Sequence, residues 1–147
     1  MDEQNVKIRL LLVDDEPLLL DSLKKVLTRR AMEVFTAENG DQALNLLQDT
    51  PIDVVVLDIK MPGMDGLDVL RRIKAGSVNR EVILLTGHPT VETAMTGMKQ
   101  GAFEYMMKPP DIAQLAELIR KAYQLRREKL AKEQQKTIQD ILRRYPD

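Results

Sequence analysis

Five short apolar runs along the chain predict five β-strands. The first, third and fourth runs are almost continuously apolar and do not alternate with polar residues. Such runs are typical of central parallel strands that are covered on both faces of a sheet. The predicted strands comprise residues 8–13, 33–36, 54–57, 82–85 and 102–107.

Between these runs, apolar residues recur every three or four positions, which is the spacing of one helix face. Pro17 lies near the start of the first helical segment, where proline is favoured. Thr90 is a predicted N-cap and Gly101 a predicted C-cap of the fourth segment, and Asp111 with Gln114 resembles a capping box that opens the fifth. The apolar positions of the five segments are Leu19, Leu23 and Val26; Ala43, Leu44 and Leu47; Leu67, Leu70 and Ile73; Val91, Ala94, Met95 and Met98; and Ile112, Leu115 and Ile119.

The strand-then-helix alternation predicts an α/β fold, a doubly wound (βα)5 architecture with a parallel five-stranded sheet between helices. Right-handed crossovers leave few topologies, and 2-1-3-4-5 is the common strand order. In this order the first and third strands are neighbours, and the chain reverses its direction of travel between them. Ligands bind at such a point, outside the carboxyl ends of the strands.

Residues 126–147 differ from the rest of the chain. They hold seven Lys/Arg and four Asp/Glu, a charge of +3, and the net charge of −1 therefore leaves −4 for residues 1–125. No proline or glycine interrupts the chain from Asp111 to Tyr145. If all of this segment were helical, it would extend about 50 Å, well beyond the sheet, and the part beyond the sheet would be a long helix, a linker or a partner-binding arm. We therefore expect a domain of residues 1–125 and a C-terminal helical extension or linker of residues 126–147.

The extension carries a short apolar stripe, which favours homodimer contacts. A sustained heptad seam is not supported, because few apolar residues precede this stripe. The other interpretation is that the extension leads into an output domain of a larger protein. The stripe consists of Ile138, Ile141, Leu142 and Tyr145.

The composition and net charge of the chain exclude several classes of function. Hydrophobic residues make up 44% and charged residues 31% of the chain, a balance typical of globular domains. The net charge of −1 argues against direct nucleic-acid binding. Because the chain has no cysteine, disulfides, thiolate catalysis and cysteine-based zinc sites are excluded. The sequence has neither a signal-peptide pattern nor an apolar stretch of membrane-spanning length, so the expected location is the cytoplasm, with no membrane contact.

Polar residues that could take part in catalysis or metal binding lie where the predicted strands end. Asp14 and Asp15 follow the first strand, Asp58 the third, Thr86 the fourth and Lys108 the fifth. Parallel strands bring these ends to one rim. Three carboxylates there would repel one another, and Mg²⁺ (or Mn²⁺) would relieve this repulsion.

A metal-bound aspartate can take a phosphoryl group as an acyl phosphate. Lys108 would supply a second cation and the Thr86 hydroxyl a hydrogen-bond donor to the transferred group.

Four segments, LLLVDDE, VVVLDIKMPGMDG, VILLTGH and FEYMMKPP, resemble the signature segments of response regulator receiver domains, and the resemblance covers about residues 6–125. It implies a flavodoxin/CheY-like fold and a two-component phosphorelay, in which a sensor histidine kinase phosphorylates Asp58. The metal would be held by Asp14, Asp15, Asp58 and the backbone carbonyl of Lys60. Such a domain would catalyse its own phosphorylation and dephosphorylation without being a conventional multiple-turnover enzyme.

The resemblance also implies a conformational switch. Thr86 would act as the switch hydroxyl and Tyr105 as the ring that turns with it, changing the face made by the fourth helix, fifth strand and fifth helix. Lys108–Pro109 would be a cis peptide. His88, the only histidine, is expected to modulate access to Asp58 together with Lys60 and not to bind metal.

The finer pattern, LDIKMPGMDGLDVL with LTGHPTVETAMTGMKQGAFEYMMKP, is most similar to receivers of nitrogen-regulatory and dicarboxylate-transport activators. The sequence departs from the family at Pro110, where Phe is commoner after Lys-Pro. The downstream effector is not indicated. Two other classes stay open: a metabolite phosphatase that uses Asp58, for which neither a second acid nor a cap is present, and an unphosphorylated docking module.

Two further expectations concern local structure. Gly63 and Gly66 in MPGMDG are predicted turn residues that need an unusual φ. The methionines, which are scattered over four elements, are predicted to fill gaps in the core.

Overall fold

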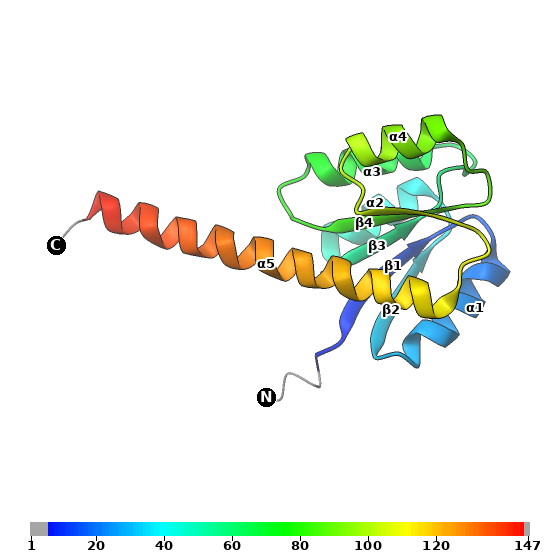
Figure 1. Ribbon diagram of the computed structural model, residues 1–147, viewed down its shortest axis with the longest axis horizontal. Helices are drawn as coiled ribbons and strands as arrows, with labels where there is room; N and C mark the ends of the chain where they lie inside the picture. Colours follow the sequence, from blue (N-terminus) through cyan, green and yellow to red (C-terminus); the bar gives the residue numbers. More distant parts are fainter. Residues whose placement is uncertain (1–5, 146–147) are drawn as a thin grey trace.

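The computed structural model describes residues 6–145 and has a five-stranded parallel sheet at its centre (Figure 1). The strand order is β2-β1-β3-β4-β5, as predicted. Register is continuous across the sheet, with Leu12 opposite both Thr36 and Val56. The strands are β1 (Ile8–Val13), β2 (Met32–Ala37), β3 (Val54–Leu57), β4 (Glu81–Thr86) and β5 (Glu104–Met107).

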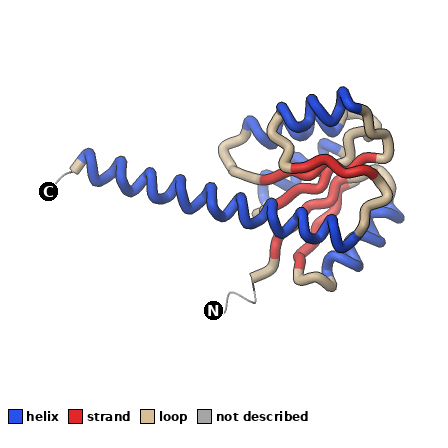
Figure 2. Tube along the Cα trace, viewed as in Figure 1, coloured by secondary structure: helices blue, strands red, loops and turns tan. Residues whose placement is uncertain are grey.

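Helices cover both faces of the sheet, because its strands are apolar on both sides (Figure 2). One face packs against side chains of α1 and α5, including Leu23 and Ile119. The other packs against α2 and α3, including Leu47 and Leu70. The helices are α1 (Pro17–Thr28), α2 (Gly40–Asp49), α3 (Gly66–Ala75), α4 (Val91–Lys99) and α5 (Ile112–Arg144).

Local sequence signals place the helix ends as predicted. The Thr90 hydroxyl accepts from the Thr93 amide in a capping box, and Asp111 accepts from the Gln114 amide. Gly101 follows α4 with a φ of +101°, the left-handed conformation that glycine adopts readily after a helix. The structure departs from the sequence prediction at the start of β5, which begins at Glu104 and not at residue 102.

Two predicted apolar faces need correction. In α1 the buried residues are Leu20, Leu23 and Leu27, because the centre of the stripe lies one position further along than Leu19 and Val26 indicated. In α4 only Gly97 is buried, Ala94 is half-buried, and the other apolar positions are exposed: Val91, Met95 and Met98. The helix approaches the sheet so closely there that a Cβ at Gly97 would lie 2.4 Å from Leu84 Cδ1.

The same geometry overturns part of the methionine prediction. Met32, Met61 and Met106 are buried in the core as expected. The exposed methionines lie on or beside the α4 and β5 surface: Met95, Met98 and Met107.

Helix α5 has 33 residues and extends beyond the domain (Figures 1 and 2). At 1.5 Å per residue it is about 50 Å long. Its buried side chains all lie in the first third: Leu115, Ala116, Ile119 and Ala122. Within residues 6–145, every helix lacks the apolar length that crossing a bilayer requires. The division between residues 125 and 126 stays a prediction.

Candidate functional site

The predicted site residues meet at the carboxyl edge of the sheet. Asp14 directly follows β1, Asp58 follows β3, Thr86 ends β4 and Lys108 follows β5. Backbone hydrogen bonds continue the strand ladders past the strand ends, because the Asp58 amide donates to Val13 O at 2.9 Å and the Lys108 amide to Thr86 O at 2.8 Å. The sheet itself therefore fixes the spacing of these side chains.

The Lys108 ammonium is surrounded by carboxylates from two other strand ends. Its Nζ lies 2.6 Å from Asp14 Oδ2 and 3.2 Å from Asp58 Oδ2. Burial alone would lower the pKa of Lys108, but its hydrogen bonds with Asp14 and Asp58 and their charges outweigh burial and raise that pKa above 10.5. The lysine is therefore a fixed positive charge within the site.

Asp14 is a buried carboxylate beside Lys108. It is 5% exposed, and its Oδ1 accepts from the Glu16 amide at 3.0 Å. Burial raises the pKa of the Asp14 carboxyl, and hydrogen bonds from Lys108 and the Glu16 amide oppose this only in part. A further cation beside Asp14 would offset the cost of burying its charge.

A cavity of about 460 Å³ opens beside Asp58 and is lined by Asp15, Lys60, His88 and Lys108. Asp58 is buried, and its Oδ1 has no hydrogen-bond partner within the described residues. Buried carboxylate oxygens are rarely left without a partner, so this atom is available to a ligand.

Oxygen donors for a divalent cation lie next to this cavity. One carboxylate oxygen from each of Asp14, Asp15 and Glu16 lies within 4.8 Å of the others. Carboxylate oxygens are the ligands that Mg²⁺ and similar hard cations prefer. This donor set and the unpaired Asp58 Oδ1 fit such an ion.

The predicted switch residues occupy the neighbouring edge. Thr86 is fully buried, and its hydroxyl accepts from the His88 amide at 3.1 Å. Tyr105 is half-buried, and its hydroxyl lies 3.0 Å from Thr93 Oγ1 and accepts from the Thr90 amide at 3.3 Å. Tyr105 thus holds the start of α4.

The two expected modulators, Lys60 and His88, are both exposed and line the cavity. The Lys108–Pro109 peptide bond is cis, the geometry that the resemblance implied.

Comparison with known proteins agrees with this geometry. The family described as the response regulator receiver domain matches residues 10–120. The chain belongs to this family. The match includes most of β1 and all of β2 to β5, and it reaches into α5. The residues at the carboxyl edge of the sheet therefore fall within it.

Curated relatives of this receiver are transcriptional regulators. It is 38% identical over 117 residues to the regulatory protein AtoC of Escherichia coli, which covers 80% of this chain and 25% of AtoC. It is 37% identical over 111 residues to the transcriptional regulator NtrC of Klebsiella pneumoniae, covering 76% and 24%. Identity to the C4-dicarboxylate transport regulator DctD of Pseudomonas aeruginosa is 36% over 125 residues, covering 84% and 27%.

These matches confirm the predicted similarity to nitrogen-regulatory and dicarboxylate-transport activators. The receiver spans only about a quarter of the length of these relatives. Among solved structures, a receiver domain from Clostridium thermocellum is 38% identical with a TM-score of 0.77, covering 84% of this chain and 98% of that one.

One residue of the receiver site was missed by the sequence analysis, and another was predicted for the wrong reason. Glu16 places Oε1 3.3 Å from Lys108 Nζ and contributes an oxygen to the acidic cluster. The signal was its position directly after Asp14 and Asp15, but an exposed acid beside a helix start also serves as an ordinary first-turn residue.

The other residue is Gly66, for which the predicted reason was wrong. Gly63 has the expected positive φ of +81°, but Gly66 does not adopt the left-handed conformation. Gly66 is required because its Cα lies against the Asp58 loop, where an added Cβ would be 2.0 Å from the Asp58 carbonyl oxygen. The glycine therefore lets the start of α3 pack against the backbone of Asp58.

Proposed function

We propose that Asp58 accepts a phosphoryl group from the phosphohistidine of a sensor histidine kinase. The observation that carries this proposal is the state of the Asp58 carboxylate. One oxygen is 3.2 Å from the Lys108 ammonium, and the other is buried beside the cavity without a hydrogen-bond partner in the described part of the chain. Membership of the receiver family supports the same assignment.

The proposed reaction is an in-line displacement at phosphorus. An Asp58 carboxylate oxygen forms the new O–P bond, the P–N bond to the kinase histidine breaks, and the leaving imidazole keeps the electron pair and takes up a proton. Lys108 provides positive charge beside the transferred group, whose negative charge spreads over its outer oxygens. The Thr86 hydroxyl donates a hydrogen bond to one of these oxygens.

Asp14, Asp15, Asp58 and the backbone carbonyl of Lys60 are the proposed ligands of Mg²⁺ (or Mn²⁺), and Glu16 adds a carboxylate at their margin. When bound, the ion supplies charge neutralisation for the carboxylates and the phosphoryl oxygens. The raised pKa of the Asp14 carboxyl, which its burial causes, supports a cation at this position.

The proposed output is a change in the α4–β5–α5 surface. Thr86 would move toward the phosphoryl group and release the His88 amide, and Tyr105 would turn inward and leave Thr90 and Thr93. Exposed apolar side chains on this surface support a protein-binding role: Val91, Met95, Met98 and Met107. The two arrangements form an equilibrium that phosphorylation shifts.

Labelling with a small acyl phosphate donor and Mg²⁺ tests the assignment. We expect a mass increase of one phosphoryl group that hydroxylamine removes, and no increase in Asp58→Asn. Asp65→Asn is the matched control, because Asp65 lines the same cavity and caps α3, and asparagine can keep that cap. Equal labelling of Asp58→Asn and the natural sequence would refute the proposal.

The remaining assignments concern organisation and partners. We propose a cytoplasmic receiver of residues 1–125, followed by an extension of residues 126–147 that makes homodimer contacts. Exposed apolar side chains near the end of α5 support the contacts: Ile138, Ile141, Leu142 and Tyr145. Sedimentation equilibrium should show mass increasing with concentration, and a monomer at all concentrations would exclude the dimer.

A further inference from the structure

Two buried carboxylates lie at the amino edge of the sheet, opposite the Asp58 site. Asp53 immediately precedes β3, and Glu81 is the first residue of β4. Each residue is only 2% exposed. Buried carboxylates require cationic or hydrogen-bonding partners, so the groups that reach them are structurally important.

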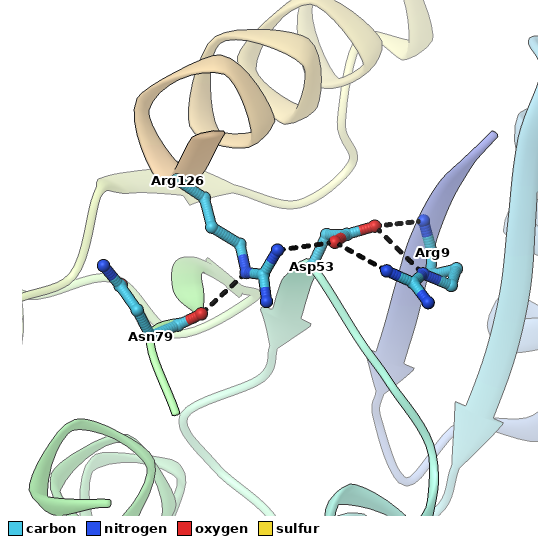
Figure 3. Close-up of polar contacts among 4 residues, drawn as sticks. All are labelled: Arg9, Asp53, Asn79 and Arg126. Atoms are coloured by element: carbon cyan, nitrogen blue, oxygen red, sulfur yellow. Dashed lines mark hydrogen bonds and ion pairs between the residues drawn. The ribbon is translucent and has the colours of Figure 1, made fainter. Parts of the chain in front are cut away.

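Asp53 is held between two arginines (Figure 3). Arg9 of β1 donates its amide to Asp53 Oδ2 at 2.8 Å and places its guanidinium Nη2 3.4 Å from Oδ1. Arg126 of α5 approaches from the other side, with Nη1 2.9 Å from Oδ1. The Arg126 Nε donates to the Asn79 carbonyl oxygen at 2.6 Å, so one guanidinium joins α5 both to Asp53 and to the loop that precedes β4.

Glu81 repeats this arrangement one strand further along. Lys129 of α5 places Nζ 2.8 Å from Oε2, and Lys74 of α3 places Nζ 3.5 Å from Oε1. Lys74 also donates to the Arg80 carbonyl oxygen at 2.8 Å. Each buried acid therefore has one cation from the domain and one from α5.

The two α5 cations continue the buried stripe of the helix. Leu115, Ile119 and Ala122 are fully buried, and Arg126 and Lys129 follow them at the next positions of the same face. Ala122 is the last fully buried residue of the helix, and half-buried Tyr123 still packs against the core. Charged contacts follow for about two further turns. Arg126 is 14% exposed at its side chain, which is much less than an ordinary surface arginine.

We propose that Asp53 and Glu81 form a docking site for this chain's own α5, which Arg126 and Lys129 occupy. This two-acid clamp keeps the helix formed beyond its last fully buried apolar residue and fixes the direction in which residues 130–144 leave the domain. It does not depend on phosphorylation of Asp58, because it lies at the other end of β3 and β4.

Distance measurements between paired spin labels test the clamp in the full chain. The chain has no cysteine, and Gln48→Cys on α2 and Gln135→Cys on α5 introduce labels at exposed positions. Labelled protein is diluted with unlabelled protein to suppress signals between copies. The test variant is Arg126→Gln with Lys129→Gln, which leaves Asp53 with Arg9 and Glu81 with Lys74.

We expect the double variant to widen the distance distribution about twofold and to lower hydrogen-exchange protection of amides 127–133 about tenfold. Lys121→Gln with Lys132→Gln is the control, since it removes the same charge from exposed positions of the same helix. An unchanged distribution and unchanged protection in the test variant, or equal changes in the control, would overturn the clamp.

A second variant provides a test if the double variant does not fold. If melting shows that the double variant is unfolded, Lys129→Gln alone replaces it, because Lys129 is 42% exposed and Asp53 keeps both arginines. A folded domain with exchange faster than in the natural sequence at amides 129–133 supports the clamp. Exchange rates at these amides equal to those of the natural sequence would overturn the clamp.

Discussion

The ammonium of Lys108 lies 2.6 Å from the carboxylate of Asp14, which links the ends of β5 and β1. The same ammonium also contacts Asp58 on β3. The Lys108 ammonium thus compensates the buried negative charges of Asp14 after β1 and Asp58 after β3. The stability of the site depends on this cation before any ligand binds.

Removal of this cation should destabilise the metal-free protein. We expect Lys108→Met to lower the free energy of unfolding by about 3 kcal/mol, because Asp14 and Asp58 lose their buried partner. Urea denaturation in the presence of a chelator measures the change. Lys60→Met is the control, since Lys60 lines the same cavity but is exposed, and its effect should stay within about 0.5 kcal/mol. Equal stability of the two variants would contradict this account of Lys108.

The close approach of Gly66 to the Asp58 loop predicts a second effect. Gly66→Ala forces Cβ against the Asp58 carbonyl, so the loop must shift, and we expect a loss of at least about 2 kcal/mol of stability with impaired labelling of Asp58. Gly76→Ala places its Cβ 3.4 Å from the Ile73 carbonyl, an ordinary contact, and should change stability by less than about 1 kcal/mol. Thermal melting and phosphodonor labelling of both variants decide the question.

The Tyr105 hydroxyl should stabilise the start of α4. Tyr105→Phe removes the hydrogen bonds to Thr90 and Thr93, so we expect a loss of about 1 kcal/mol and faster hydrogen exchange at the Thr90 and Thr93 amides. Tyr123→Phe is the control, because its ring stays in place near the Arg127 guanidinium. Unchanged exchange at α4 in Tyr105→Phe would show that the helix start is held by its capping box alone.

The charges around Lys74 predict shifts of opposite sign. Burial lowers the pKa of Lys74 below 10.5, Glu81 opposes this, and the positive charge of Lys129 adds to it. We therefore expect Lys129→Gln to raise the pKa of Lys74 and Glu81→Gln to lower it further. Titration of the Lys74 side chain by NMR measures both. Shifts of the same sign in the two variants would contradict the arrangement.

A stability consequence follows from the same lowered pKa of Lys74. Between that pKa and 10.5, the folded protein holds fewer protons at Lys74 than the unfolded chain. The Lys74 contribution therefore makes the free energy of unfolding rise with pH in this window. Comparison of the natural sequence with Lys74→Met over this pH range isolates the contribution.

The sheet and the Asp58 site could be predicted because their signals are local. Buried parallel strands are continuously apolar, and a parallel sheet necessarily brings the residues after its strands to one edge. Asp14, Asp58, Thr86 and Lys108 therefore meet as the sequence indicated. The outward face of α4 could not be predicted, because the helix approaches the sheet through Gly97, whose lack of a side chain carries no periodic signal.

The two-acid clamp escaped prediction for a different reason. Arg126 and Lys129 resemble solvated residues of a charged helix, and their partners Asp53 and Glu81 lie 73 and 48 positions earlier in the chain. Only the packing of α5 along the sheet brings these charges together. Similarly, Gly66 was identified as a turn residue, but the close approach that requires it arises between α3 and the loop after β3.

The unbroken course of α5 has a mechanical consequence. Arg144 lies eighteen positions after Arg126, and at 1.5 Å per residue this distance is about 27 Å. A tilt of about 10° at the sheet edge would therefore swing the far end of the helix by roughly 5 Å. A displacement too small to alter the packing of the domain would thus become a shift of several ångströms at the far end of the helix.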